Sequence, residues 1–347
     1  MSNQLSLLIP GLLTPPQSLQ QLSAEDKPVV KILNRFFSRA KPETFPAQDY
    51  YPTLFHLFGL ANESDKDHPI AAVTYLADSG EQHADWTLRC DPAYILADMD
   101  RAVLMGHGAL GLSREESEQL VMIINAHVEQ DGWQIEAHAI DRWYVKGTDK
   151  NNIRTTPPQS ILGQDIKHDL PKGGDAGYWC SIMNECQMLL HDLPVNIARQ
   201  ERGVPPVNSL WFWGGGELPE KANSLFDKVF TDDPLVSGLC LLSHTDYAST
   251  DTLWQDMEQH DKKHYLLVID DLIEPQINGD LFAWLDVVKN LEPLVIEKLI
   301  NMLKQKKLDE VTLYTADGSR FTLTPKRLRH WWKRSTGFTN LLEQATK

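Results

Sequence analysis

Several features that would place this 347-residue sequence in a known class at once are missing from it. It has no run of about 18 apolar residues, which argues against a membrane-spanning helix. It also has no GxGxxG, Walker A, GxSxG or HExxH motif, so the common nucleotide, serine-hydrolase and zinc-protease signatures are absent. Residues 1–17 lack a basic segment and a cleavage site, and we expect a first strand there rather than a signal peptide.

Cysteine and basic residues are also scarce. Cys90, Cys180, Cys186 and Cys240 form no CxxC pair, which favours free thiols in a reducing cytoplasm. The 33 basic residues are outnumbered by 48 acidic ones, giving a formal charge of −15. This balance argues against broad binding to nucleic acid or anionic membranes, although it leaves room for one local basic site. We therefore predict a cytoplasmic protein.

The first half of the chain mixes strand and helix patterns. Ser113 and Glu116 form a capping box that opens a helix through about residue 129. Apolar residues at helical spacing predict a helix near 29–36. The apolar or alternating segments predict strands at 5–12, 70–77 and 86–90, and a hairpin from 133–138 and 142–146.

The second half alternates strands with helices. After a polar loop at 148–175, the pattern predicts one long helix over about 178–201, which ends at Gly203 before two prolines. We expect strands at 207–213, 238–244, 264–270 and 311–316, and a helix over about 281–305. Such alternation predicts a mostly parallel sheet that is covered by helices on both faces.

Two further patterns suggest functions, each with a structural alternative. His260 and His264 have a spacing that can bind zinc, but a solvated helix end explains the hydrophilic stretch as well. Residues 325–335, PKRLRHWWKRS, could grip single-stranded nucleic acid by stacking and phosphate contacts. The acidic total favours an amphipathic helix that buries Leu328, Trp331 and Trp332. An acidic protein partner at the basic residues 326–334 is a further hypothesis.

Residues 184–219, NECQMLLHDLPVNIARQERGVPPVNSLWFWGGGELP, resemble the RpfE-type regulatory proteins. More distantly, they resemble the archaeal-type cofactor-independent phosphoglycerate mutases of the alkaline phosphatase superfamily. In those mutases, an HPVN…R…G…N pattern precedes a strand that ends in a glycine-rich turn. The residues that match are Pro194, Val195, Asn196, Arg199, Gly203 and Asn208, whereas Leu193 replaces the histidine. The likeness to the RpfE-type proteins covers most of the chain, and the likeness to the mutases is strongest over about 135–220.

The resemblance to the mutases can be tested at the metal ligands, because those enzymes hold two divalent metals between strand ends. Their first strand ends in Asp-Gly, where this chain has Ile9-Pro10-Gly11. Their D-E-x-G-H-x-G-D pattern aligns with residues 273–280, where isoleucine replaces both the Asp and the His, and their A-D-H becomes Ala316-Asp317-Gly318. Isoleucine cannot coordinate a cation, so we predict no bound metal. If the register is shifted, the fallback ligands for Mn²⁺ or Zn²⁺ are Asp270, Asp271, Glu274 and Asp317.

The same resemblance suggests a site for a small anionic ligand. It places the glycine turn at the C-terminal edge of a strand, where open α/β sheets bind ligands. The candidate residues of this anion cleft are Asn196, Arg199, Asn208, Gly214, Gly215 and Gly216. Arginine and amide side chains can hold a carboxylate or phosphate. Equally, both asparagines could satisfy backbone groups, and Arg199 could pair with Glu201 or Glu185.

The resemblance implies an alkaline-phosphatase-like α/β core from residues 1–60 and 205–347, with a mostly parallel sheet sandwiched by helices. A smaller α+β lobe, residues 61–204, would be inserted there and would end in a long junction helix. We predict a non-catalytic regulatory or small-anion-binding protein that lacks the two-metal ligands. The alternative is an active metal-dependent phosphoryl-transfer enzyme, of mutase or phosphatase type, with a displaced metal site. An adaptor that uses its basic tail is the third hypothesis.

Overall fold

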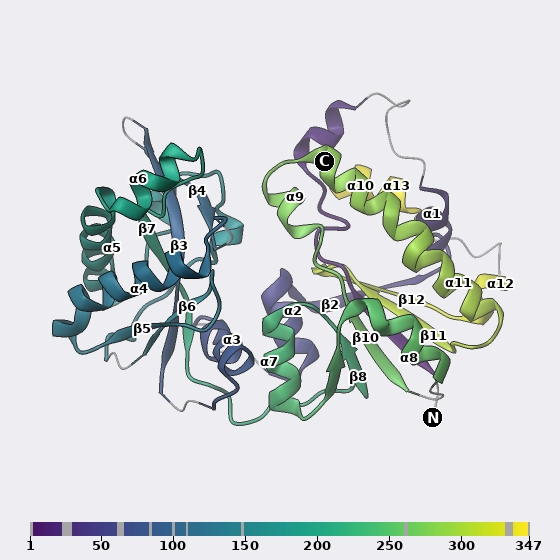
Figure 1. The fold of residues 1–347 in the computed structure, drawn as a ribbon. Helices are drawn as coiled ribbons and strands as arrows, with labels where there is room; N and C mark the ends of the chain where they lie inside the picture. Colours follow the sequence, from purple (N-terminus) through teal and green to yellow (C-terminus); the bar gives the residue numbers. More distant parts are fainter. Residues whose placement is uncertain are drawn as a thin grey trace. The chain divides into compact units, whose positions relative to one another are not determined.

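The chain folds into two compact units, and each contains its own sheet (Figure 1). The computed structural model describes residues 3–22, 30–60, 66–82, 85–98, 101–108, 110–146, 149–259, 263–329 and 336–345. The first unit combines Met1–Ala61 with Ala222–Lys347, and the second unit is Asn62–Lys221. Within the first unit, the backbone N–H of Asn223 donates to the carbonyl of Phe58 over 2.8 Å. The chain therefore leaves the first unit and returns to it at adjacent points.

A seven-stranded sheet forms the centre of the first unit, in the order β2-β12-β11-β1-β10-β8-β9. Strands β11, β1, β10, β8 and β9 are parallel, and β12 and β2 are antiparallel to their neighbours. Their bounds are β1 Gln4–Leu8, β2 Lys41–Gln48, β8 Lys228–Phe230, β9 Asp246–Ala248, β10 His264–Val268, β11 Glu310–Tyr314 and β12 Asp317–Leu323. The predicted strands at 5–12, 264–270 and 311–316 are confirmed.

Both faces of the central strands of this sheet are buried. Leu5, Leu7 and Leu267 belong to one hydrophobic cluster, together with Phe37 and Trp284 from helices. The neighbouring strand residues, such as Leu8 and Leu266, point to the opposite face and are also buried. Parallel strands that are covered on both sides read as continuous apolar runs, which is why LSLL and HYLLV could be recognised in the sequence.

The helices of the first unit come from both of its chain segments. They are α1 Lys31–Phe37, α2 Tyr50–Leu57, α7 Pro234–Ser243, α8 Leu253–Gln259, α9 Ile273–Ile277, α10 Leu281–Leu291, α11 Glu297–Lys304, α12 Pro325–Arg329 and α13 Phe338–Ala345. The predicted helix at 281–305 contains a π-helical segment, Glu292–Ile296, between α10 and α11. Glu292 Oε1 accepts hydrogen bonds from the backbone of Ile32 (2.7 Å) and Leu33 (2.8 Å). Glu292 thus satisfies free N–H groups at the start of α1, whose N-cap residue makes no side-chain bond.

The second unit contains a five-stranded antiparallel sheet and four α-helices in its described part. The strands follow the order β4-β3-β6-β5, and β7 additionally pairs with β3 between Thr87 and Ala93. The bounds are β3 Thr87–Asp98, β4 Arg101–His107, β5 Gln134–Ala137, β6 Trp143–Lys146, β7 Ser209–Gly216, α3 Ile70–Ser79, α4 Arg114–Val128, α5 Ala176–His191 and α6 Pro194–Glu201. The capping box at Ser113 and the hairpin near 133–146 are confirmed.

Two predicted strands, 70–77 and 238–244, are wrong, because both segments lie in helices, α3 and α7. Each segment is apolar on nearly every side, so its hydrophobic pattern shows no period that separates a buried helix from a buried strand. The start of α7 does carry a local signal. Asp233 caps it by accepting from the N–H of Leu235, and Pro234 occupies the first turn.

The predicted long helix at 178–201 is two helices, α5 and α6, which are separated at Pro194. Leu193 adopts an extended conformation because the ring of the following proline disfavours the helical one. Pro194 then starts α6, where its missing N–H costs nothing.

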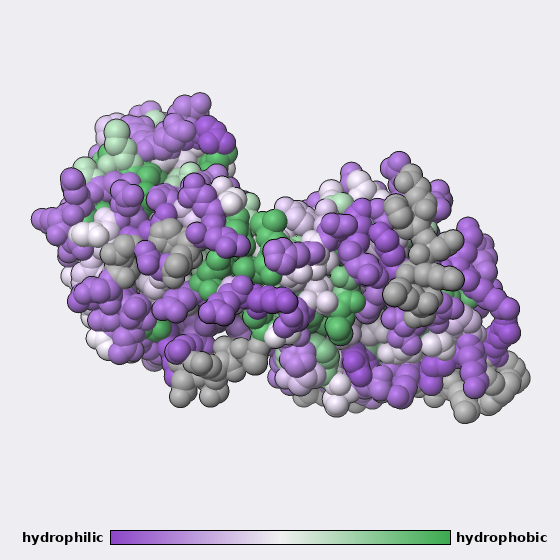
Figure 2. Space-filling model, turned by 90° about the horizontal axis from the view of Figure 1, so that it is seen from below, coloured by the Kyte–Doolittle hydropathy of each residue, from purple (hydrophilic) through white to green (hydrophobic). Residues whose placement is uncertain are grey.

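The predicted class, α/β with a mostly parallel sheet and a second α+β part, is confirmed. The boundary differs, since residues 205–221 fall in the second unit instead of the core, and β7 pairs antiparallel with β3. No helix among the described residues is long and apolar enough to span a bilayer. On the face drawn in Figure 2, hydrophilic residues cover most of each unit.

Candidate functional site

The C-terminal edge of the parallel sheet in the first unit is the place where the sequence predicted lost metal ligands. Leu8 pairs with both Val268 of β10 and Tyr314 of β11. The three strands therefore end at the same level. The residues that follow them are Ile9-Pro10-Gly11, Ile269-Asp270-Asp271 and Thr315-Ala316-Asp317. Ile9-Pro10 and Thr315-Ala316 carry no carboxylate. After β10, in contrast, Ile269 is followed by the pair Asp270 and Asp271.

Strand β8 adds two carboxylates that the sequence analysis missed. Phe230 pairs with Leu267, so Asp232 and Asp233 emerge beside the end of β10. Asp233 also caps α7. The signal that could have revealed its second role is its place directly after a parallel strand, where such sheets place ligand-binding residues.

The neighbouring carboxylates affect the pKa of Asp270. Burial by the surrounding protein, together with the charges of Asp233, Asp271 and Asp232, raises the pKa of Asp270 to about 6. Its side chain still reaches solvent. The other three carboxylates are therefore close enough for their charges to act on Asp270.

Tyr50, at the start of α2, also joins this edge. Its hydroxyl donates a short hydrogen bond to Asp233, and burial together with the charges of Asp233 and Asp270 raises the pKa of Tyr50 well above its usual value. The preceding residue, Asp49, has φ +67°, and its N–H donates to the carbonyl of Ala316, which has φ +59°. Left-handed conformations cost side-chain-bearing residues free energy, so the packing around both must hold them there.

The remaining fallback ligands are not brought into this group. Asp317 accepts hydrogen bonds from Thr315 Oγ1 (2.7 Å) and from Ser319 N (3.1 Å), which fixes the turn into β12. Glu274 is exposed in the first turn of α9. In the described part of the chain, no group of three or more His, Cys, Asp or Glu side chains is arranged to hold a metal ion. Of the candidate zinc pair, His260 lies outside the described residues, and His264 Nε2 lies 3.0 Å from Ser6 Oγ.

In the second unit, the predicted anion-cleft side chains have structural partners. Asn196, which is 1% exposed, donates to the carbonyls of Leu190 and Val207 and accepts from the N–H of Val207. Asn208 accepts from the N–H of Ile95 and donates to its carbonyl. Both amides therefore satisfy backbone groups, which is the structural alternative.

Arg199 is completely buried and is likewise engaged. It forms an ion pair with Glu116 at 2.6 Å and donates to the carbonyls of Pro205, Leu110 and Gly111. Its acidic partner is thus Glu116, and neither of the predicted candidates, Glu201 and Glu185. All three side chains of the predicted cleft, Asn196, Arg199 and Asn208, thus make hydrogen bonds within the second unit.

The three glycines lie within β7 and do not form a turn after it. A Cβ atom on Gly215 would lie 2.3 Å from the Trp86 ring, and one on Gly216 would lie 2.6 Å from Pro69 Cβ. The N–H of Gly214 donates to Thr155 Oγ1 (2.9 Å). The glycines therefore let neighbouring segments of the second unit pack tightly against the strand.

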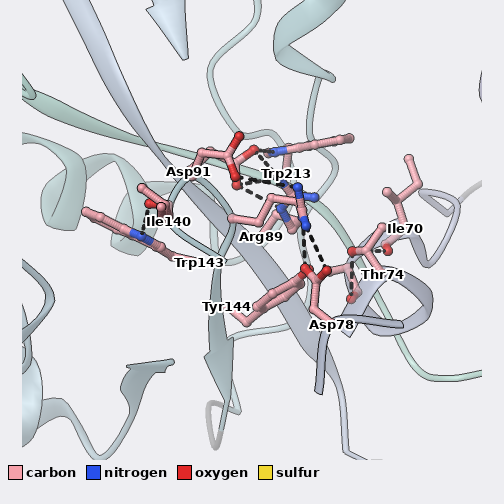
Figure 3. A network of polar contacts seen from close by, with 12 residues as sticks. Ile70, Thr74, Asp78, Arg89, Asp91, Ile140, Trp143, Tyr144 and Trp213 are labelled. Carbon is pink, nitrogen blue, oxygen red and sulfur yellow. Dashed lines mark hydrogen bonds and ion pairs between the residues drawn. The ribbon is translucent and has the colours of Figure 1, made fainter. Parts of the chain in front are cut away.

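A network of charged side chains lies in the core of the second unit (Figure 3). Arg89 donates two 2.7 Å hydrogen bonds to Asp91, and the Trp213 indole donates a third at 2.8 Å. The Arg89 guanidinium lies 5.0 Å from the centre of the Trp213 ring and 5.5 Å from that of Tyr144. Arg89 is 6% exposed and Asp91 is 1% exposed, so this is a desolvated ion pair.

A second ion pair lies beside the first. Arg142 donates two 2.8 Å hydrogen bonds to Asp78, and the Tyr144 hydroxyl donates to the same carboxylate at 2.5 Å. Burial opposes ionisation, but the bonds from Arg142 and Tyr144 hold the pKa of Asp78 below its usual value. Asp78 lies on α3, and its bond from Tyr144 ties this helix to β6. The contact of Arg89 with Tyr144 and the bond from Trp213 to Asp91 extend the network to β3 and β7.

The comparisons with known proteins agree with this architecture. A family model described as 2,3-bisphosphoglycerate-independent phosphoglycerate mutase matches residues 78–196, which lie in the second unit. A protein of Geobacter sulfurreducens, named as a probable enzyme of that kind, is 29% identical over 175 residues, or 50% of this chain and 43% of that protein. A mutase of Methanosarcina barkeri is 27% identical over 138 residues, or 39% of this chain and 34% of the other. The matches thus span less than half of these relatives.

A solved structure of a Pyrococcus horikoshii protein has the same fold, with a TM-score of 0.52 and 14% identity, over 93% of this chain and 87% of that one. In sequence, the chain is therefore distantly similar to the cofactor-independent phosphoglycerate mutases, and the family match lies at residues 78–196.

Proposed function

We propose that this protein is a non-catalytic, regulatory relative of the phosphoglycerate mutases that has lost the two-metal phosphotransferase centre. The observation that carries the proposal is the composition of the strand ends. β1 and β11 are followed by Ile9-Pro10 and Thr315-Ala316, whose side chains supply neither a carboxylate nor an imidazole. Two-metal phosphoryl transfer needs ligands from several strand ends, because one metal activates the nucleophile and the other stabilises the leaving oxygen. The regulatory part of the proposal follows the resemblance to the RpfE-type proteins.

A second candidate function is kept because of the carboxylates at β8 and β10. Asp232, Asp233, Asp270 and Asp271 offer oxygen ligands of the kind that Mg²⁺ or Mn²⁺ prefers. A single displaced cation at this group could support a phosphatase-like reaction. This second candidate is an active metal-dependent phosphoryl-transfer enzyme with a displaced metal site.

One experiment separates the two. The purified chain is loaded with Mn²⁺ or Zn²⁺, dialysed and assayed for bound metal by inductively coupled plasma mass spectrometry, beside mutase and phosphatase assays. The non-catalytic proposal expects no retained metal and no turnover. One or more retained equivalents, with turnover that disappears in Asp270→Asn but not in the exposed control Asp286→Asn, would favour the enzyme and overturn the proposal.

A further inference from the structure

A group of cations gathers on the first unit of this otherwise acidic protein, between α1 and α12. Lys31, Arg35 and Arg39 follow one another at four-residue intervals and therefore share one side of α1 and the turn after it. Helix α12 contributes Lys326, Arg327 and Arg329. We call these six residues the basic surface.

Hydrogen bonds made by Arg39 and Arg327 hold the two segments of the basic surface side by side. Arg327 donates to the carbonyls of Arg39 (2.7 Å) and Ala40 (3.2 Å), and Arg39 donates back to the carbonyl of Leu328. Leu328 is buried beneath them in the hydrophobic core. The basic surface is thus held together by contacts between distant parts of the sequence. Arg39 and Leu328, for example, are 289 positions apart.

The basic surface differs from ordinary surface lysines and arginines in how its charges are arranged. Arg327 uses its guanidinium on neutral carbonyls, so its positive charge is not cancelled there. Arg35, Lys326 and Arg329 are exposed, and among the described residues no carboxylate lies within ion-pair distance of these three. Like charges this close repel one another, and the repulsion is relieved when an anionic partner binds.

We propose that the basic surface is a docking site for an acidic protein segment rich in Asp and Glu. The charge complementarity is local, since the chain as a whole carries −15 and repels extended polyanions at long range. A short acidic segment can meet the six cations without covering the acidic remainder of the chain, whereas nucleic acid would extend past them. The described part of the surface also offers no exposed aromatic ring for base stacking. This inference goes beyond the proposed function and does not depend on whether catalysis survives.

The test uses the full-length protein and a fluorescein-labelled, glutamate-rich peptide, with an oligothymidylate of matched length as the competing probe. The variant combines Arg35→Gln, Lys326→Gln and Arg329→Gln, because these side chains make no hydrogen bond or ion pair with another described residue and their removal should leave the fold intact. The matched control combines Arg114→Gln, Lys172→Gln and Lys221→Gln, which remove the same charge from exposed sites of the second unit. Fluorescence anisotropy at low salt gives the affinities, and circular dichroism checks that both variants fold.

We expect the patch variant to bind the peptide about tenfold more weakly than the native chain, and the control variant to bind it almost unchanged. The native affinity should fall as salt is added. The proposal would be overturned by the absence of peptide binding at low salt, by equal losses in the two variants, or by tighter binding of the oligothymidylate. The metal and turnover measurements stand apart from this assay, so one proposal can fail without the other.

Discussion

The side-chain amide of Asn208 acts as a strand partner for Ile95. Its Oδ1 accepts from the Ile95 N–H and its Nδ2 donates to the Ile95 carbonyl, both at 2.8 Å. Asn125 makes the same pair of bonds with Ile135 in β5, at 2.7 and 2.9 Å. In both cases, an asparagine satisfies the outward-facing backbone of a strand residue where no backbone partner continues the ladder.

Replacing Asn208 with alanine should therefore destabilise the second unit. Two backbone groups of Ile95 lose their partners, and the expected loss is about 1–3 kcal/mol in the free energy of unfolding. Urea unfolding monitored by tryptophan fluorescence measures it. The control Asn184→Ala, on the exposed face of α5, should stay within about 0.5 kcal/mol. Equal stability of the two variants would show that the Asn208 bonds contribute nothing.

Asp270 should make the first unit less stable at neutral pH than at acid pH. A raised carboxyl pKa means that the folded state holds the proton more tightly than the unfolded state, where the pKa is near 4. The stabilisation is present below about pH 4 and is lost as the pH rises through about 6. Asp270→Asn should therefore gain about 1 kcal/mol over the native chain at neutral pH, after a discount for solvent screening.

The gain of Asp270→Asn should vanish at about pH 4, where the native carboxyl is also neutral. Parallel urea titrations at the two pH values measure this difference. Asp286→Asn, on the exposed side of α10, serves as the control and should show no pH-dependent gain. A gain of equal size at both pH values would mean that the charge of Asp270 is not its cause.

The glycines of β7 give a steric prediction. Gly216→Ala places a methyl group 2.6 Å from Pro69 Cβ and 2.8 Å from its Cα, and a proline ring cannot turn aside. We expect a loss of about 1–3 kcal/mol in thermal or urea unfolding. Gly177→Ala in α5 meets nothing within 4 Å and should instead stabilise the protein by about 0.5–1 kcal/mol. Opposite signs for the two substitutions are required.

Removing Asp91 should be among the most damaging single changes. Asp91→Ala leaves the Arg89 charge and the Trp213 N–H buried without their acceptor, which should cost about 3–5 kcal/mol. Adding Arg89→Met to the same chain removes the uncompensated charge and should recover part of the loss. If the double variant is no more stable than Asp91→Ala, the buried charge is not the reason for the damage.

Glu292 should stabilise α1 from a distant part of the chain. Glu292→Ala exposes two N–H groups in the first turn of α1, and we expect a loss of about 1–2 kcal/mol in urea unfolding. Glu297→Ala, on the exposed side of α11, is the matched control and should change little. A loss confined to Glu292→Ala identifies the cap as the cause.

The parts of the fold that sequence analysis predicted are those with a local signal. The capping box of Ser113 and Glu116 predicted α4, and the alternation of apolar and polar residues around Ile135 and Trp143 predicted a hairpin. The helices at 70–79 and 234–243 were misread because an all-apolar segment has no period. Asn196, Arg199 and Asn208 were candidate ligand residues because the sequence does not show that they are buried or which carbonyls they meet. The carboxylates Asp232 and Asp233 became neighbours of Asp270 only through the pairing of β8 with β10.

The return of the chain beside its point of departure has a consequence for synthesis. Strand β1 is made first, but its two neighbours, β10 and β11, are translated only after the whole second unit. The second unit can fold on the ribosome from contiguous sequence, since domains fold as units during translation. Until then, β1 has neither of its two neighbouring strands to pair with. The hydrogen bond between Phe58 and Asn223 lies where the folded second unit brings the two segments of the first unit together. The chain that must close before β1 meets β10 is then much shorter in effect than the sequence separation between these strands.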